Sequence, residues 1–416
     1  MNRVLITILG LLLIINSGNY SQQTDKKVTL SVYGNILYQY FDYGPNQRAT
    51  IDGSKKDSRA IIDVPKFVIA PAFYFDSTFY IDSEIEFEHL GTGSAMEIEY
   101  EEFGEYEFET EKGGEVLLEE IHLNKLVSEE FNIRIGRFPL ALTLFNDRHR
   151  PLGYFSNTYP ESESTILPTV WVETGVEVFG KILDFAYNLA LVNGLDASGF
   201  SSERWVASGY QNKYELIKAS DLAAVLRLNF IGVNNTIIGT GLYFGNSTDN
   251  RPKPEDMEGI DANVFVLSLH GRYDDGNLKL RTNFIYGNLT SSALVSERNA
   301  RLSVNSQNPR TPVAKNALGY YVELGYNIAP IIGITQDVKL IPFGKYDYYN
   351  SMYDVETNVF ANPRFERSVY TFGFNTVWKN QIVLKADFSS RIVGKGNYNT
   401  ENTFSLGIGF MTSILN

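Results

Sequence analysis

Four carboxylates recur at every second position of the segment 82–88. They are Asp82, Glu84, Glu86 and Glu88, and the positions between them include Ile85 and Phe87. A β-strand places alternate side chains on the same face, so this spacing predicts a strand with one acidic and one apolar face. Because neighbouring carboxylates repel one another in a dry core, we expect the acidic face to meet water. The chemistry that such a face supports is electrostatic selection of solutes.

Further charged residues fall on the same predicted inner surface. The acidic wall comprises Asp82, Glu84, Glu86, Glu120, Glu173 and Glu177. The basic wall comprises Arg134, Arg227, Arg272, Lys279 and Arg281. Walls of opposite charge across a channel create a transverse field, which orients polar solutes and disfavours apolar ones. The alternative is that these charges neutralise one another or surround a plugged lumen.

The segment 139–169 is the candidate for narrowing such a channel. It contains Arg148, His149 and Arg150 in the run Asn-Asp-Arg-His-Arg-Pro. Inside a pore, the two arginines would supply fixed positive charge opposite the acidic wall. Outside, the same run would be an ordinary exposed turn. The sequence favours neither alternative.

Enzyme, metal and cofactor signatures are not found. The chain contains no cysteine, and its four histidines match no metal-binding helix or nucleophile elbow. His122 beside Glu120 and Asn124 could belong to a hydrolase, but a hydrogen-bonded wall residue is the better interpretation. The acidic segment 97–115 could bind divalent cations, although its spacing matches no calcium loop and a solvated surface is favoured. The net charge of −13 argues against a nucleic-acid partner. We therefore predict no enzyme, no cofactor and no metal site.

The elements that position these residues are strands, because apolar and polar side chains alternate with period two from residue 28 onwards. We predict sixteen strands, at about 28–41, 64–75, 78–90, 116–127, 131–138, 170–180, 183–193, 219–231, 234–245, 262–273, 277–287, 317–328, 335–349, 367–379, 380–392 and 403–414. Most are long enough to cross a bilayer at a tilt.

The connections between these strands alternate between short and long. An antiparallel transmembrane β-barrel with short periplasmic turns and long extracellular loops has this pattern. The predicted fold is therefore all-β, a single barrel over 22–416. Such a barrel meets outer-membrane lipid and lipopolysaccharide in a Gram-negative bacterium.

The first 21 residues indicate export. A short basic start precedes the apolar run Val4 to Ile15, and small polar residues follow as far as Ser21. This arrangement is typical of a secretory signal peptide, which we predict at 1–21. After residue 22 there is no run of eighteen apolar residues, so membrane-spanning helices are not expected.

One region resembles a known family of porins. The segments FNIRIGRFPLALTLFNDRHRP and ILPTVWVETGVEVFGKILDFAYNLALVNGL, within residues 130–195, are similar to the phosphate-selective porin O and P family. The resemblance implies a sixteen-stranded, commonly trimeric outer-membrane channel whose third loop folds into the pore. Family members that select phosphate line the pore with an arginine and lysine ladder. The lumen predicted here is mixed in charge, so phosphate selectivity is not transferred.

The predicted function is that of a porin-like channel for passive diffusion of small hydrophilic solutes or ions. The alternative is an occluded structural or partner-binding barrel without open-pore activity. Long, charged extracellular loops suit both.

Overall fold

The structure, a computed structural model, describes residues 28–45, 56–89, 95–98, 108–111, 116–144, 150–211, 216–303, 308–334, 337–394 and 400–415. The predicted signal peptide lies outside the described residues. So do the constriction candidates Arg148 and His149, and most of the acidic segment 97–115.

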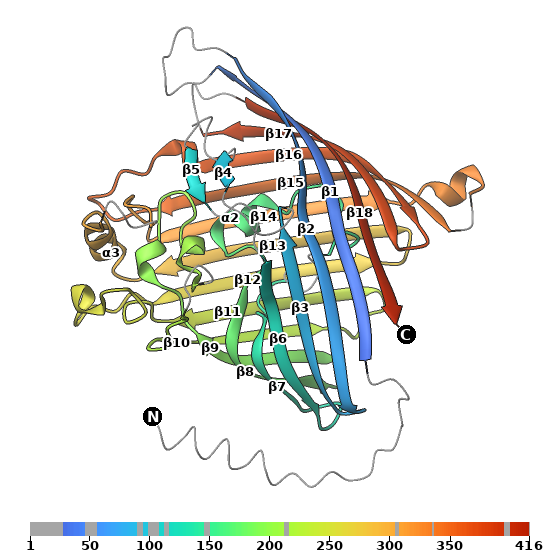
Figure 1. Ribbon diagram of the computed structural model, residues 1–416. Helices are drawn as coiled ribbons and strands as arrows, with labels where there is room; N and C mark the ends of the chain where they lie inside the picture. The colour runs from blue at the N-terminus through green and yellow to red at the C-terminus, as the bar shows by residue number, and fades with distance from the viewer. Residues whose placement is uncertain are drawn as a thin grey trace.

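Sixteen strands of the described chain close into one antiparallel barrel (Figure 1). In chain order they are β1 (Val28–Pro45), β2 (Lys56–Asp76), β3 (Phe79–Glu88), β6 (Val116–Leu126), β7 (Asn132–Pro139), β8 (Val172–Ile182), β9 (Phe185–Asn193), β10 (Leu222–Phe230), β11 (Thr236–Gly245), β12 (Val264–Asp274), β13 (Leu278–Leu289), β14 (Asn316–Tyr326), β15 (Val338–Asp354), β16 (Glu366–Trp378), β17 (Ile382–Val393) and β18 (Thr400–Leu415). Figure 1 shows β1 beside β18, and this pairing leaves the sheet without an exposed edge. The predicted all-β antiparallel barrel is confirmed, and each predicted segment overlaps one barrel strand.

The exterior of the barrel is apolar because the predicted alternation holds along the strands. On β9, Leu189 and Leu191 are 52% and 48% exposed, whereas Ala190 and Val192 between them are buried. The same arrangement recurs on β10, where Leu228 is exposed and Val225 is buried. A contiguous apolar exterior of this kind is unfavourable in water and suits a lipid environment.

Long and short connections lie at opposite ends of the barrel. In Figure 1, α3 (Ser292–Asn299) and η4 (Pro254–Met257), which belong to two long loops, are on the left, and the turn that contains η5 (Ala329–Ile332) is on the right. The turn between β12 and β13 shows how the sequence sets a short connection. Gly276 has a positive φ of 94°, and its N–H donates to the Asp274 carboxylate at 3.1 Å.

Smaller elements occupy the long loops. The second loop contains a two-stranded sheet of β4 (Ala95–Ile98) and β5 (Phe108–Glu111), which the charge pattern of that loop did not predict. The third loop contains α2 (Glu161–Ile166), the fourth contains η1 (Ala197–Gly199) and η2 (Ala207–Gly209), and η6 (Pro363–Phe365) precedes β16. Of the helices in the described chain, none has the length and apolar character to cross a membrane.

Candidate functional site: the lumen of the barrel

The order of the strands decides which charged residues face each other. β3 and β13 are eight places apart around the closed ring of sixteen strands, so they lie on opposite sides of the lumen. Asp82, Glu84 and Glu86 are on β3, whereas Lys279 and Arg281 are on β13. The strand order therefore puts these acidic and basic candidates on opposite walls.

The acidic wall is partly neutralised by its neighbours. Glu84 accepts hydrogen bonds from the Tyr33 hydroxyl at 2.8 Å and from Arg150 at 2.7 Å, and Lys66 pairs with Glu86 at 3.0 Å. Arg150 comes from the third loop, so a constriction candidate does contact the acidic wall. Asp82 is only partly buried and, among the described residues, forms no ion pair. Glu120 lies 3.6 Å from the ring of His122.

Three sequence candidates occupy positions other than those expected. Arg134 on β7 pairs with Glu177 on the adjacent strand β8 at 2.9 Å, so it lies within the acidic wall and not opposite to it. Glu173 is 1% exposed, because Trp171 and Asn193 donate hydrogen bonds to its carboxylate and cover it. Glu177 is also fully buried. Strand parity gives the face of a residue, but it does not reveal what covers that face.

The basic candidates form hydrogen bonds or ion pairs with other residues of the protein. Arg227 donates to the carbonyl oxygen of Thr143 in the third loop at 3.0 Å. Arg281 pairs with Glu323 on the neighbouring strand. Arg272 and Lys279 both pair with Asp274, at 2.8 and 3.3 Å, close to the short turn that joins their strands. These groups are engaged with the protein, which reduces the charge that they offer to a solute.

The third loop lies inside the barrel and is fastened to the wall formed by β15 and β17. Asp347 accepts hydrogen bonds from the backbone N–H groups of Glu161 and Ser162, at 2.6 and 3.0 Å. Asp387 accepts one from the backbone of Asn157 at 2.7 Å, and Lys385 donates to the carbonyl oxygen of Tyr154 at 2.9 Å. Hydrogen bonds to charged groups are among the stronger ones in proteins, so this wall holds the loop firmly.

A bidentate ion pair completes the attachment. Arg391 on β17 contacts both carboxylate oxygens of Glu161, at 2.8 and 2.9 Å, and the hydroxyl of Tyr349 donates to the same carboxylate at 2.7 Å. Burial by itself raises the pKa of Glu161. The neighbouring Arg391 and these hydrogen bonds outweigh burial and lower the pKa to about 2. Glu161 is therefore ionised at neutral pH and secures α2 inside the lumen.

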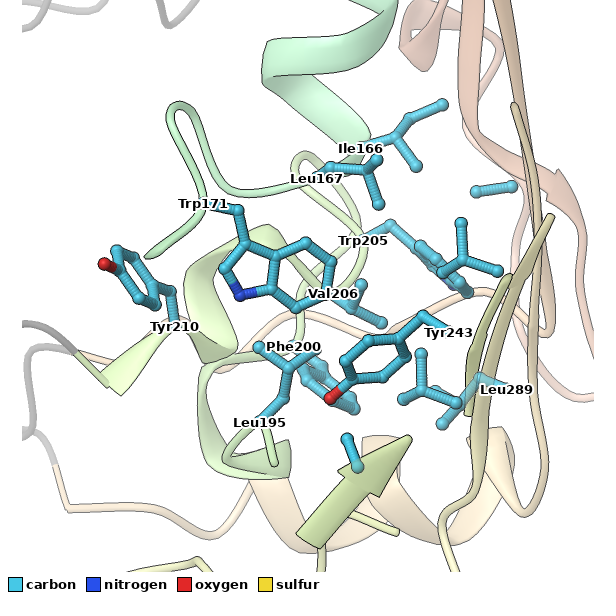
Figure 2. Close-up of a cluster of buried hydrophobic side chains, with 14 of the residues drawn as sticks. Ile166, Leu167, Trp171, Leu195, Phe200, Trp205, Val206, Tyr210, Tyr243 and Leu289 are labelled. Carbon is cyan, nitrogen blue, oxygen red and sulfur yellow. The ribbon is translucent and has the colours of Figure 1, made fainter. Parts of the chain in front are cut away.

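One half of the lumen, which we call the filled half, is occupied by apolar side chains from the third and fourth loops (Figure 2). Figure 2 shows Trp171 beside Tyr243, and Trp205 in the same cluster. The ring centroids of Trp171 and Tyr243 are 4.8 Å apart. Trp205 is fully buried, and its indole N–H donates to the carbonyl oxygen of Ala314 at 3.1 Å. Inward residues of the barrel, such as Val266 and Ile285, complete the cluster. The lumen is therefore not polar throughout.

The remainder, which we call the open half, contains a cavity of about 450 Å³. β1, β2, β3 and β6 contribute lining residues, as do β15 to β17 and the third and fourth loops. Its charged lining residues are Asp63, Lys66, Glu86, Glu88, Glu119, Glu161, Glu203, Arg204, Arg367 and Arg391. The cavity lies among the long-loop ends of these strands. It is a polar vestibule of a size that can hold a small solute.

Inward-facing glycines mark where the loops are seated, and the sequence analysis did not use them. A Cβ atom on Gly287 of β13 would collide with the indole ring of Trp205. A Cβ on Gly407 of β18 would collide with the side chain of Asn157. Glycine is required at such close approaches because any side chain would occupy the space of the loop. Glycines at inward positions of the predicted strands could therefore have indicated that loops are inserted into the barrel.

The remaining polar groups of the described chain include two buried histidines. Within the described ranges, no group of three or more histidine, aspartate and glutamate side chains is placed to hold a metal ion. His122 contacts Asn124 at 3.0 Å, and His270 contacts Ser268 and Asn229 at 3.1 and 2.8 Å. Both histidines are buried in hydrogen-bonded networks of the barrel wall.

Comparisons with known proteins agree with this architecture. No family model matches the chain. A protein of Aquifex aeolicus (strain VF5), described only as uncharacterized, is 23% identical over 368 residues, which cover 88% of this chain and 76% of that relative.

Several solved outer-membrane proteins share the fold. The anion-selective porin from Comamonas acidovorans superposes with a TM-score of 0.53 at 8% identity, covering 92% of this chain and 99% of the porin. The fold is that of the porins. The outer membrane channel DcaP of Acinetobacter baumannii gives a TM-score of 0.52 at 10% identity, over 92% and 97% of the two chains. OmpF of Salmonella typhi, solved in complex with daunomycin, gives 0.53 at 11% identity, over 94% and 99%. At these identities the likeness concerns the fold alone.

Proposed function

We propose that this chain is a porin-like channel in the outer membrane of a Gram-negative bacterium, through which small hydrophilic solutes or ions diffuse passively. One observation carries the proposal: the third loop is fastened inside a closed barrel and leaves beside it a cavity of about 450 Å³ that is lined by charged residues. A loop that narrows a barrel without filling it sets a size limit for solutes and brings them close to fixed charges.

The apolar exterior and the predicted signal peptide support the proposed location. Outer-membrane lipid and lipopolysaccharide would contact the exterior, and three copies would assemble as in the phosphate-selective porin O and P family that residues 130–195 resemble. A passive channel needs neither an enzymatic site nor a cofactor, and the acidic chain suits no nucleic-acid partner. The proposal therefore assigns the protein no catalytic activity.

The proposed selectivity filter lies where Arg150 meets the acidic wall. The side chain of Arg150 is 42% exposed although it pairs with Glu84, and its guanidinium lies 5.2 Å from the ring centroid of Tyr33. Asp82 and Glu120 belong to the same wall. A solute that passes this point meets one exposed cation beside several carboxylates, so the balance between them sets the sign of ion selection.

The filled half favours a second candidate, an occluded structural or partner-binding barrel. Trp171 and Trp205 block part of the lumen with a dry cluster that water and ions cannot cross. A barrel whose remaining cross-section is also covered would not conduct.

Conductance of the refolded full chain in a planar lipid bilayer tests the proposal, with a salt gradient to give the reversal potential. Stepwise conductance is expected from a diffusion channel. The absence of steps from protein whose fold is verified by circular dichroism would reject the channel and favour the occluded barrel.

A further inference from the structure

Glu119 reaches the vestibule because the pairing of β3 with β6 is irregular. Glu84 pairs with Glu120 and Ile85 pairs with Leu118, so Glu119 is the extra residue of a β-bulge. A bulge re-aims a side chain, and Glu119 lines the cavity although regular alternation would turn it to the exterior. Sequence parity missed this residue for that reason.

The carboxylate of Glu119 forms no ion pair with the nearby Arg137 and Lys66, although both attract it electrostatically. Arg137 donates instead to the main-chain carbonyl oxygen of Glu119 at 2.8 Å and to the hydroxyl of Tyr210 at 2.7 Å. Lys66, also in the vestibule, pairs with Glu86. Among the described residues, Glu119 has neither an ion pair nor a side-chain hydrogen bond, and it is only half-buried.

The basic residues of the vestibule are mostly engaged elsewhere. Arg391 is held by Glu161 and Glu401, with its closest contacts at 2.8 and 2.7 Å. Arg367 donates to the hydroxyl of Tyr349 at 3.0 Å and is 6% exposed. Six carboxylates and four lysine or arginine side chains line the cavity, as far as the described residues show. The excess of carboxylates favours cations over anions in the vestibule.

Aromatic rings in the same cavity suit an organic cation better than a bare metal ion. Tyr154 and Tyr159 lie edge to face with their centroids 5.0 Å apart, and Tyr210 lines the cavity as well. Lys66 lies 6.0 Å from the ring centroid of Tyr159, so this ring already faces one ammonium group. Cations over tyrosine faces are stabilised by the ring quadrupole, and the apolar part of a ligand can pack against the same rings.

We propose that the vestibule binds small organic ammonium ions, with the carboxylate of Glu119 as the principal charged contact and the tyrosine rings as the apolar surface. The proposal rests on the proposed function, because it names the class of solute that the channel would hold before passage. The ligand class follows from a carboxylate without an ion pair, an excess of acidic groups and adjacent aromatic rings in one cavity.

Isothermal titration of the detergent-folded full chain tests the site with three probes of similar shape: benzylammonium, neutral benzyl alcohol and anionic benzoate. We expect benzylammonium to bind more tightly than the other two. Glu119→Gln should weaken benzylammonium binding about tenfold, the usual effect of losing a hydrogen bond to a charged group. Glu119→Asp, which keeps the charge, should retain most of the affinity.

Glu255→Gln is the matched control, because it removes the same charge from an exposed residue of η4 outside the cavity. Its affinity for benzylammonium should equal that of the unmodified protein. Equal binding of benzoate and benzylammonium, unchanged affinity in Glu119→Gln, or equal losses in the Gln and Asp variants would overturn the ammonium site.

Planar-bilayer recordings separate this proposal from the channel proposal. A chain that binds benzylammonium but does not conduct overturns the channel and keeps the site. A chain that conducts but binds no benzylammonium overturns the site alone.

Discussion

The filled half and the open half of the lumen are enclosed by the same sheet, yet their interiors differ. In the filled half, inward residues such as Val225 and Val266 pack under Trp171 and Trp205. In the open half, inward residues such as Lys66 and Arg391 form ion pairs beside a cavity. The content of each half depends on the side chains that its strands direct into the lumen. Apolar side chains of the strands pack against apolar residues of the loops, whereas burying charged side chains under such residues would be unfavourable.

We therefore expect the filled half to contribute mainly to the stability of the fold and the open half to ion selectivity. The dry cluster contributes free energy of folding because it removes apolar surface from water. The vestibule contributes charges that a solute can meet. Substitutions in the filled half should therefore affect unfolding most, and those beside the cavity should affect conduction most.

The largest expected effect on stability comes from the filled half. Trp205→Ala should lower the free energy of unfolding by about 3–5 kcal/mol, because it leaves a large cavity in a fully buried cluster. Urea unfolding in lipid vesicles, followed by circular dichroism, measures the change. Tyr159→Ala beside the cavity is the comparison, and an equal loss there would contradict the division into two halves.

The ion pair that holds α2 should contribute less, and its contribution should depend on pH. Glu161→Gln should cost about 2 kcal/mol near neutral pH, the range for hydrogen bonds to charged groups. The pKa of Glu161 is lowered to about 2 in the folded protein, below its ordinary value of about 4.3. The stabilisation is therefore complete above about pH 4.3 and is lost as the pH falls towards 2.

This pH dependence is tested by comparing the free energy of unfolding of the unmodified protein with that of Glu161→Gln at several pH values. The difference between the two proteins should shrink as the pH falls below about 4. A difference that grows in acid would show that Glu161 is not held ionised by Arg391.

A smaller loss should follow from adding one methyl group beneath Trp205. Gly287→Ala places a Cβ atom where the indole ring lies, and overpacking of this size costs about 1 kcal/mol. Urea unfolding measures the loss. Gly276→Ala is not a suitable control, because the positive φ of Gly276 would itself strain alanine. Gly271→Ala is suitable, since an added Cβ there meets only ordinary contacts.

The smallest effect on stability should come from Arg150, whose side chain is 42% exposed. Arg150→Ala removes the exposed cation beside Glu84 and leaves the carboxylate uncompensated, so the reversal potential should shift towards cation selectivity. Conductance in a salt gradient measures this shift. A shift towards anions, or a loss of folding as large as that of Trp205→Ala, would contradict the role given to Arg150.

Most of the fold could be predicted, since every strand contains its own evidence in the period-two alternation. The positions of Leu189 and Ala190 on opposite faces of β9 follow from that period alone. Much less of the site could be predicted. Glu173 was predicted on the inner face from strand parity, but its cover by Trp171 depends on the position of the third loop.

Glu119 illustrates the second limit of sequence parity. One extra residue in β6 turns its side chain into the vestibule, and no local pattern marks that bulge. The residues that anchor the third loop, such as Asp347 and Asp387, were missed for another reason. Their partners Ser162 and Asn157 lie 185 and 230 residues away in the chain, so only the folded barrel brings them together.

The sequence by itself determined the class of fold, the number of strands and the face of most side chains, because these depend on local alternation and on the lengths of connections. Only the tertiary structure decided which half of the lumen is filled, which charges are neutralised and which carboxylate stands beside the cavity. Those properties depend on long-range contacts between loops and the inner wall, whose free energies are not encoded in any single segment.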